Sequence, residues 1–147
     1  MKFTRNDIFA IAKVPYNLGG DKSNSNIEYL KWVDFIDTHS DHFIWKENTK
    51  EGVETLTNID KVPESFKERV LDSLNKSACY KEFDVKKGFY NINLGFNYID
   101  NMVSIGFERT PKLEDLKIFL AMANHLDAFL LKDGTEIIDE RVIDSLG

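Results

Sequence analysis

Three parts of the chain carry apolar residues at the spacing of an amphipathic helix. They predict helices over about 25–38, 63–74 and 112–126. The first has the broadest apolar face, which is made by Ile27, Leu30, Val33, Ile36, Tyr29, Trp32 and Phe35. A face of this width predicts a largely buried helix.

Residue pairs at the spacing of a helix cap predict shorter helices elsewhere. Thr4 and Asp7 have the spacing of a capping box, and a following proline limits the helix that they start to about 4–13. A similar pair predicts a short helix over about 48–59, and the stretch "ERVIDSL", 140–146, predicts a terminal one.

Toward the middle of the chain, the apolar pattern changes to the alternation of a β-strand. Two consecutive stretches, 89–98 and 102–108, each place their apolar residues on one face. A two-residue turn at Asp100-Asn101 pairs Phe96 with Ile105 and sets both apolar rows on the same side. We therefore expect an antiparallel hairpin whose apolar face packs under the helix at 112–126.

The opposite face of this hairpin carries small and polar residues. Asn91, Asn93 and Asn97 follow one strand and Glu108 ends the other, while the same register places Gly95 opposite Gly106. Glycine in a strand often marks a bulge or a close approach of another backbone. The face is either a solvated surface with a local bulge or a flat platform on which a partner docks.

The remaining pattern completes an α+β fold in which an antiparallel sheet has helices packed on one face. Further strands are expected in "HFIWKE", 42–47, and "ACYKEFDV", 78–85, and Asp133-Gly134 predicts a hairpin between two apolar runs. We expect one globular domain over 1–147, interrupted by a short polar linker over 17–26.

Composition and charge narrow the classes of partner. The formal net charge is −6, whereas proteins that bind nucleic acid directly usually carry a basic surface, so we expect no such contact. No apolar run reaches the roughly 18 residues of a membrane helix, and charged residues interrupt the N-terminal stretch where a signal peptide would be apolar. With a single cysteine, these features predict a cytoplasmic protein that does not bind membranes.

The sequence offers little for catalysis or metal binding. The stretch "DTHSDHF", Asp37–Phe43, holds His39 and His42, but no further histidine lies near it in sequence and its residues favour a turn. Cys79 lacks a CxxC partner and His125 lies beside a core stripe, while GxGxxG, GK[ST] and GxSxG motifs are missing. We expect no catalytic residue, no metal and no cofactor.

Two stretches give the chain a resemblance to a known class. "FIWKENTKEG" and "LKIFLAMANHLDAFLLKDGTEIID" resemble bacterial immunity proteins of polymorphic-toxin and contact-dependent growth inhibition systems, over roughly a quarter of the chain. The resemblance implies a cytoplasmic, acidic, non-catalytic protein that binds a cognate toxin domain, often a nuclease, and occludes its active site. It transfers no functional residue.

Two polar surfaces are the candidates for contact with such a partner. One is the acidic group Glu47, Glu51 and Glu54, and the other is the hairpin face with Asn91, Asn93, Asn97 and Glu108. Acidic groups steer a basic partner, and amides fix its orientation through hydrogen bonds. A small cytoplasmic enzyme and a non-catalytic subunit of a complex remain alternative functions, and the oligomeric state stays open.

Overall fold

The computed structural model describes residues 1–20 and 24–146. In chain order these residues form β1 (Phe9–Ala12), α1 (Tyr29–Thr38), β2 (Ile44–Trp45), α2 (Lys50–Thr57), α3 (Glu64–Ser73), β3 (Ala78–Asp84), β4 (Phe89–Asn97), β5 (Met102–Phe107), α4 (Leu113–His125), β6 (Phe129–Lys132), β7 (Glu136–Ile138) and α5 (Glu140–Leu146). Two short 3₁₀ helices, η1 (Lys46–Asn48) and η2 (Ile59–Lys61), flank α2. The sheet and its helices confirm the predicted α+β class.

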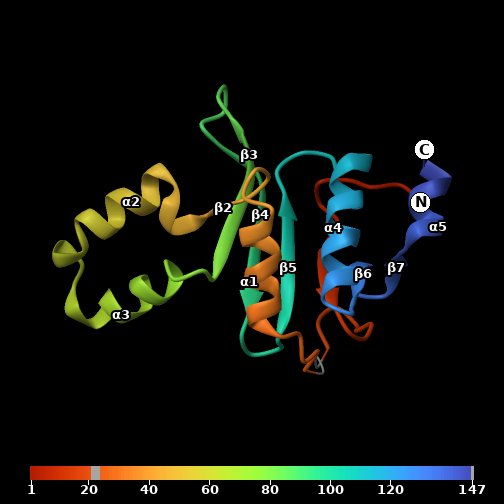
Figure 1. The fold of residues 1–147 in the computed structure, drawn as a ribbon, viewed down its shortest axis with the longest axis horizontal. Helices are drawn as coiled ribbons and strands as arrows, with labels where there is room; N and C mark the ends of the chain where they lie inside the picture. The colour runs from red at the N-terminus through yellow and green to blue at the C-terminus, as the bar shows by residue number, and fades with distance from the viewer. Residues whose placement is uncertain (21–23, 147) are drawn as a thin grey trace.

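All seven strands belong to one antiparallel sheet with the order β2-β3-β4-β5-β1-β6-β7. Helices α1 and α4 lie side by side on one face of this sheet, as predicted (Figure 1). Helices α2 and α3 instead extend sideways from the β2–β3 edge. The sheet therefore has one helix-covered face and an arm that projects from one edge.

Aromatic side chains fill the layer between the sheet and its two covering helices. Trp32 of α1 lies 5.7 Å from Phe96 of β4, and Phe119 of α4 lies 5.9 Å from Phe107 of β5, measured between ring centroids. All four side chains are buried. Each such pair contributes about 0.5–1.5 kcal/mol beyond the area it buries, so these contacts fix both helices on the sheet.

The predicted helix over 4–13 is wrong, because the apolar part of this segment is strand β1. The cap residues do interact as their spacing predicts, since the backbone N–H of Thr4 donates to Asp7 Oδ2 at 2.7 Å, but they close only a turn. All four residues of β1 are buried between β5 and β6. Burial in the middle of a sheet outweighs the local cap signal.

The β4–β5 hairpin exists, but its predicted register is wrong by two residues. Phe96 pairs with Val103 rather than Ile105, and the loop covers the residues between Asn97 and Met102. Gly95 consequently faces Ser104, whereas Gly106 faces Asn93. A shift of two residues keeps each side chain on its face, so the apolar rows still face the core.

Several boundaries differ from the predicted ones. Helix α1 begins at Tyr29 because the residues before it are not helical. Glu28 is extended, Asn26 has a φ of 52°, and the Ser25 and Ile27 N–H groups donate to carbonyls of the β4–β5 loop. The strand expected over 42–47 shortens to Ile44–Trp45. The hairpin at Asp133-Gly134 and the terminal helix are confirmed. Residues 21–23 of the predicted linker lie outside the described residues.

None of the helices in the described part of the chain has the length and hydrophobicity required to span a bilayer.

Candidate functional site

The arm formed by η1, α2, η2 and α3, residues 46–74, leaves much of its apolar surface uncovered. Helix α3 contains no buried residue, and Gly52 is the buried residue of α2. Four large apolar side chains on these helices are 38–51% exposed: Val53, Leu56, Phe66 and Leu71. Helices of this length are marginal in water unless another surface packs on them. The arm therefore has the character of an interaction surface.

The base of the arm is held firmly to the rest of the fold. Glu47 Oε2 accepts a hydrogen bond from the Lys76 backbone N–H at 2.6 Å, and the Tyr29 hydroxyl donates to the Lys76 carbonyl at 2.9 Å. The Lys76 ammonium contacts Asp37 at 3.0 Å, and the Trp45 indole donates to the same carboxylate at 2.8 Å. The indole hydrogen bond lowers the pKa of Asp37. These contacts position the arm before any partner binds.

An open groove lies between this arm and the β3–β4 hairpin, with a volume of about 1020 Å³. Its lining combines apolar, aromatic and charged side chains. The lining residues are Lys46, Thr49, Lys50, Glu51, Gly52, Glu54, Thr55, Val70, Ser73, Leu74, Tyr80, Phe83, Gly88, Phe89, Tyr90, Asn93 and Glu108.

Aromatic rings from the hairpin form one wall of the groove. Tyr80 stacks on Tyr90 with 5.2 Å between ring centroids, and Phe83 meets the edge of Tyr90 at 5.0 Å. Partial burial raises the pKa of Tyr80. Phe83 is 51% exposed and Phe89 is 44% exposed, so the wall is apolar and still accessible. Rigid aromatic surfaces of this kind are the usual anchors of protein interfaces.

The wall exists because the alternation of side chains is interrupted in the hairpin. Asn91 and Ile92 are neighbours on β4 and both are buried, so Tyr90 falls on the groove side. On β3, Glu82 has a φ of 63°, in the left-handed region that non-glycine residues rarely adopt. This backbone position allows Phe83 to join Tyr80 in the groove.

An ion cluster on the helix-covered side holds this interruption in place. The Arg109 guanidinium donates two hydrogen bonds to Glu82, at 2.6 and 2.8 Å, and two to Asp115, at 2.8 and 3.2 Å. Asn91 Nδ2 donates to Glu82 at 2.7 Å, and Asp115 accepts from the N–H of Lys112, the N-cap residue of α4. The Arg109 hydrogen bonds lower the pKa of Glu82 to about 2.

The structure brings four of the seven predicted partner-binding residues together. Glu51 and Glu54 on α2, Asn93 on β4 and Glu108 after β5 all line the groove, and all four are exposed. The acidic group and the hairpin face were two separate surfaces in the sequence. In the fold they form opposite sides of one concave site.

The other three predicted residues have structural roles. Glu47 is half-buried and fastens the base of the arm, so it is not part of a solvated acidic surface. Asn91 is 6% exposed because it joins the ion cluster, and it does not lie on the solvated hairpin face. Asn97 Oδ1 accepts from the N–H groups of Ile99 and Asp100, at 2.9 and 3.2 Å, and shapes the β4–β5 loop.

The aromatic wall was missed in the sequence. Alternation placed Tyr90 with Ile92 on the core face, and no pattern in the sequence marks the left-handed backbone at Glu82. One signal was present, because alternation from Tyr90 and Ile92 places Phe89 on the opposite face of the same strand. A ring on that face predicts an exposed aromatic side chain.

The histidine cluster forms a turn, as predicted, at the end of α1. The His42 N–H donates to the His39 carbonyl at 2.9 Å, and the His39 ring stacks on Phe35 at 3.9 Å. His125 of α4 lies on the same aromatic ring, at 5.6 Å, although it is distant in sequence. Among residues 1–20 and 24–146, no group of three or more His, Cys, Asp or Glu side chains could hold a metal ion.

We predict that no transition metal copurifies with the protein. His39 Nδ1 already lies 2.7 Å from the Phe35 carbonyl, which leaves little freedom for the ring to turn toward a shared ion. Elemental analysis of protein purified without chelators tests this expectation. About one zinc per chain, lost on His39→Ala, would contradict it.

Cys79 lies on the core side of β3. It is fully buried, and burial raises the pKa of its thiol. A protonated, enclosed thiol is a poor nucleophile. The residue therefore acts as a small apolar side chain in the core.

In comparisons with known proteins, no family model matches the chain, and neither the curated proteins nor the solved structures include a significant match.

Proposed function

We propose that this chain is an immunity protein that binds and neutralises a cognate bacterial toxin domain of the nuclease class by occluding its active site. The observation that carries the proposal is the groove between the arm and the β3–β4 hairpin. It joins an exposed aromatic wall and acidic groups, and hydrogen bonds hold its base in place.

A protein is the partner that fits this surface best. The four uncovered apolar side chains of α2 and α3 lie outside the lining of the groove, so a small ligand bound in the groove would leave them uncovered. Interfaces between proteins combine a core of aromatic anchors with a polar rim. Tyr90 and Phe83 correspond to such anchors, while Glu51, Glu54 and Glu108 correspond to the rim.

The charge of the chain favours a basic partner. The net charge of −6 attracts a positively charged cleft such as a nuclease uses for its phosphate substrate. Carboxylates on the rim act mainly on the rate of association and its salt dependence. The resemblance to immunity proteins points to the same class of partner.

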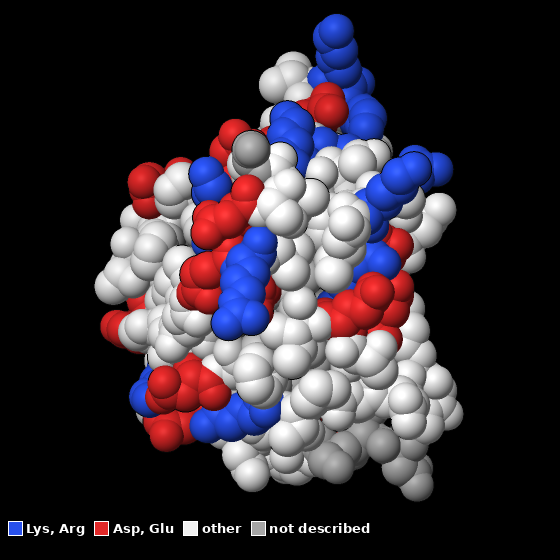
Figure 2. Space-filling model, turned by 90° about the vertical axis from the view of Figure 1, so that its right-hand side faces the viewer, with Lys and Arg blue, Asp and Glu red and all other residues white. Residues whose placement is uncertain are grey.

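The face at the α5 end of the molecule is less suited to this role. Figure 2 shows acidic and basic side chains there in small neighbouring groups of both signs, so no extended acidic field covers that face. A surface of mixed charge mainly aids solubility. The groove therefore remains the preferred contact site.

We expect Phe83→Ala to weaken binding of the toxin domain encoded beside this chain. Truncating a ring that becomes buried in the complex should cost about 2 kcal/mol, or roughly thirtyfold in Kd. Ile99→Ala is the matched control, because Ile99 is 86% exposed and lies in the β4–β5 loop away from the groove. Titration calorimetry with an inactivated toxin domain measures both variants.

Co-expression is the corresponding test in cells. The wild-type chain and Ile99→Ala should protect cells that express the active toxin domain, whereas Phe83→Ala should protect them less. Equal killing with and without the wild-type chain, or the lack of any complex at micromolar concentration, would count against the proposal. A gene neighbourhood without a toxin gene would count against it as well.

An enzyme that binds a small molecule in the groove is the second candidate. The volume of about 1020 Å³ lies at the upper end of the range for ligand sites. Among the described residues that line it, the ionisable side chains are Lys, Glu and Tyr, and no His or Cys is present. A metabolite that raises the melting temperature, together with failure to bind any toxin domain, would favour this candidate.

A further inference from the structure

The loop that joins β3 to β4 is a preorganised tip. The Asp84 carboxylate accepts hydrogen bonds from the Lys86 and Lys87 N–H groups, both at 3.1 Å. The Gly88 N–H donates to the Asp84 carbonyl at 2.8 Å, and Gly88 has a φ of 79°, which glycine adopts without strain. These hydrogen bonds favour one shape of the tip, which lowers the entropic cost of binding through its side chains.

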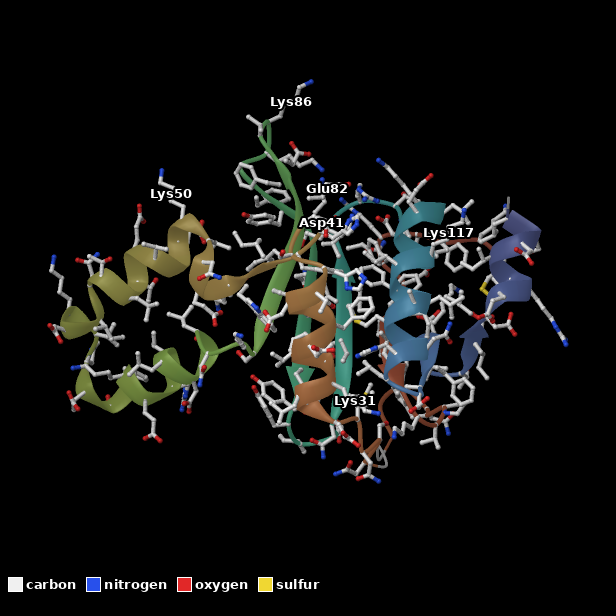
Figure 3. The ribbon with its side chains drawn as sticks, in the orientation of Figure 1. Lys31, Asp41, Lys50, Glu82, Lys86 and Lys117 are labelled. Atoms are coloured by element: carbon white, nitrogen blue, oxygen red, sulfur yellow. The ribbon has the colours of Figure 1, made fainter. Side chains whose placement is uncertain are left out.

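This tip combines apolar and basic side chains on an acidic protein. Val85 is 84% exposed, and Lys86 and Lys87 are exposed beside it. The Lys87 ammonium lies 5.7 Å from the centre of the Phe89 ring. Figure 3 shows Lys86 at the end of the hairpin, pointing away from the molecule. A convex surface of this composition fits a concave, aromatic and acidic site.

The groove has these complementary properties. Three carboxylates line it, from Glu51, Glu54 and Glu108, against two ammonium groups, from Lys46 and Lys50. Its aromatic wall supplies apolar contacts and can receive an ammonium group over a ring face. Gly88 and Phe89 themselves line the groove, so the hairpin is its wall and cannot bend into it. A tip that binds in the groove would therefore have to come from another molecule.

We propose that two copies of this chain form a two-fold dimer in which each β3–β4 tip lies in the groove of the other copy. The tip and the groove are adjacent on one side of the molecule. The tip is convex and the groove is concave, so their shapes are complementary. In a two-fold dimer every contact is made twice, because each copy offers the same two surfaces. Adjacent, complementary surfaces can satisfy this symmetry within one closed interface, so the assembly stops at two copies.

The dimer covers the surface that we assign to the toxin partner. If that assignment holds, the toxin competes with the second copy for the groove and binds a single chain. Apparent toxin affinity then falls as the concentration of this chain rises. The dimer involves only copies of this chain, so it is tested without any toxin. If no dimer forms, the proposed function is unaffected.

Analytical ultracentrifugation of the full chain, from low micromolar to about 100 μM, tests the dimer. We expect a concentration-dependent species with twice the mass of the chain. Lys86→Glu with Lys87→Glu should raise the dimer dissociation constant at least about tenfold, because each tip lysine would then face carboxylates. Lys2→Glu with Lys117→Glu is the control with the same change of charge, placed on exposed lysines outside the groove.

A charge exchange identifies the contact itself. Glu51→Lys with Glu54→Lys should also weaken the dimer, and combining it with the two tip substitutions should restore association. A monomer over the whole concentration range would overturn the proposal. A dimer that responds equally to the tip and control pairs, or that the charge exchange does not restore, would overturn it too.

Discussion

Replacing Arg109 with alanine is expected to lower the free energy of unfolding by about 3 kcal/mol at neutral pH, because it leaves two carboxylates in the fold without their cation. Asp115 is 2% exposed and receives two of the four Arg109 hydrogen bonds. The Glu82 side chain is 33% exposed, so water can replace part of the hydrogen bonding that it loses with Arg109. Urea denaturation followed by tryptophan fluorescence measures the change.

The effect of Arg109→Ala should shrink in acid. The pKa of Glu82 in the folded wild type is about 2, below its ordinary value of 4.5, so the ion pair contributes fully above about pH 4.5 and is lost as the pH falls toward 2. In the variant Glu82 lacks the cation that lowers its pKa, so it takes up its proton at a higher pH than in the wild type, and this relieves its unpaired charge. Arg141→Ala, at an exposed position on α5, should change stability by no more than about 0.5 kcal/mol. A pH-independent difference, or one no larger than this control, would show that the cluster is not the cause.

Gly52→Ala is expected to destabilise the fold by about 2–3 kcal/mol and to displace α2. A methyl group at this position would overlap the Lys46 carbonyl and lie only 2.8 Å from the Glu47 Cα atom, and both are backbone atoms that cannot rotate away. The Gly52 N–H also donates to the Thr49 hydroxyl, which caps the helix, at 3.1 Å. Because Glu51 and Glu54 lie on the same helix, the groove should lose its shape as well.

Hydrogen exchange of α2 and urea denaturation together measure this effect. Amides of Lys50–Thr57 should exchange faster in the variant, whereas those of the core strands should change only with global stability. Gly95→Ala is the matched control, because a methyl group there meets its nearest atom at 3.8 Å, an ordinary contact. Unchanged exchange in α2 would mean that the close contact with η1 does not position the helix.

Elements are predicted best from the sequence when the local apolar pattern agrees with the contacts that the element makes in the fold. The helix expected over 112–126 is α4, because its apolar stripe packs on the sheet where the pattern places it. The turn at Asp133-Gly134 is also found, since glycine accepts the φ of 79° that the loop needs.

Elements that depend on distant partners could not be predicted. The cap at Thr4 and Asp7 is local and real, but the identity of β1 depends on β5 and β6, which no local pattern reveals. The β4–β5 register shows a second limit. A loop two residues longer leaves each apolar residue on the same face, so alternation fits both registers equally.

The site was half predictable for a related reason. Glu51 and Asn93 occupy polar positions in the predicted helix and strand, so the sequence predicts that both are exposed. Both line the groove. The aromatic wall depends on one left-handed residue, Glu82, whose conformation the distant Arg109 stabilises. A single inversion of the backbone therefore redirects the rings that give the groove its apolar character.

The interior position of β1 in the sheet, between β5 and β6, has a consequence for how the chain folds. This strand is synthesised well before both of its partners, since Phe9 pairs with Ile105 on one side and Lys132 on the other. The β3–β4–β5 meander can form from neighbouring segments, whereas inserting β1 requires closing loops that span most of the chain, and such long-range pairing is slow. We therefore expect this apolar strand to stay unpaired until β5 and β6 have been synthesised, and unpaired apolar strands of this kind favour aggregation.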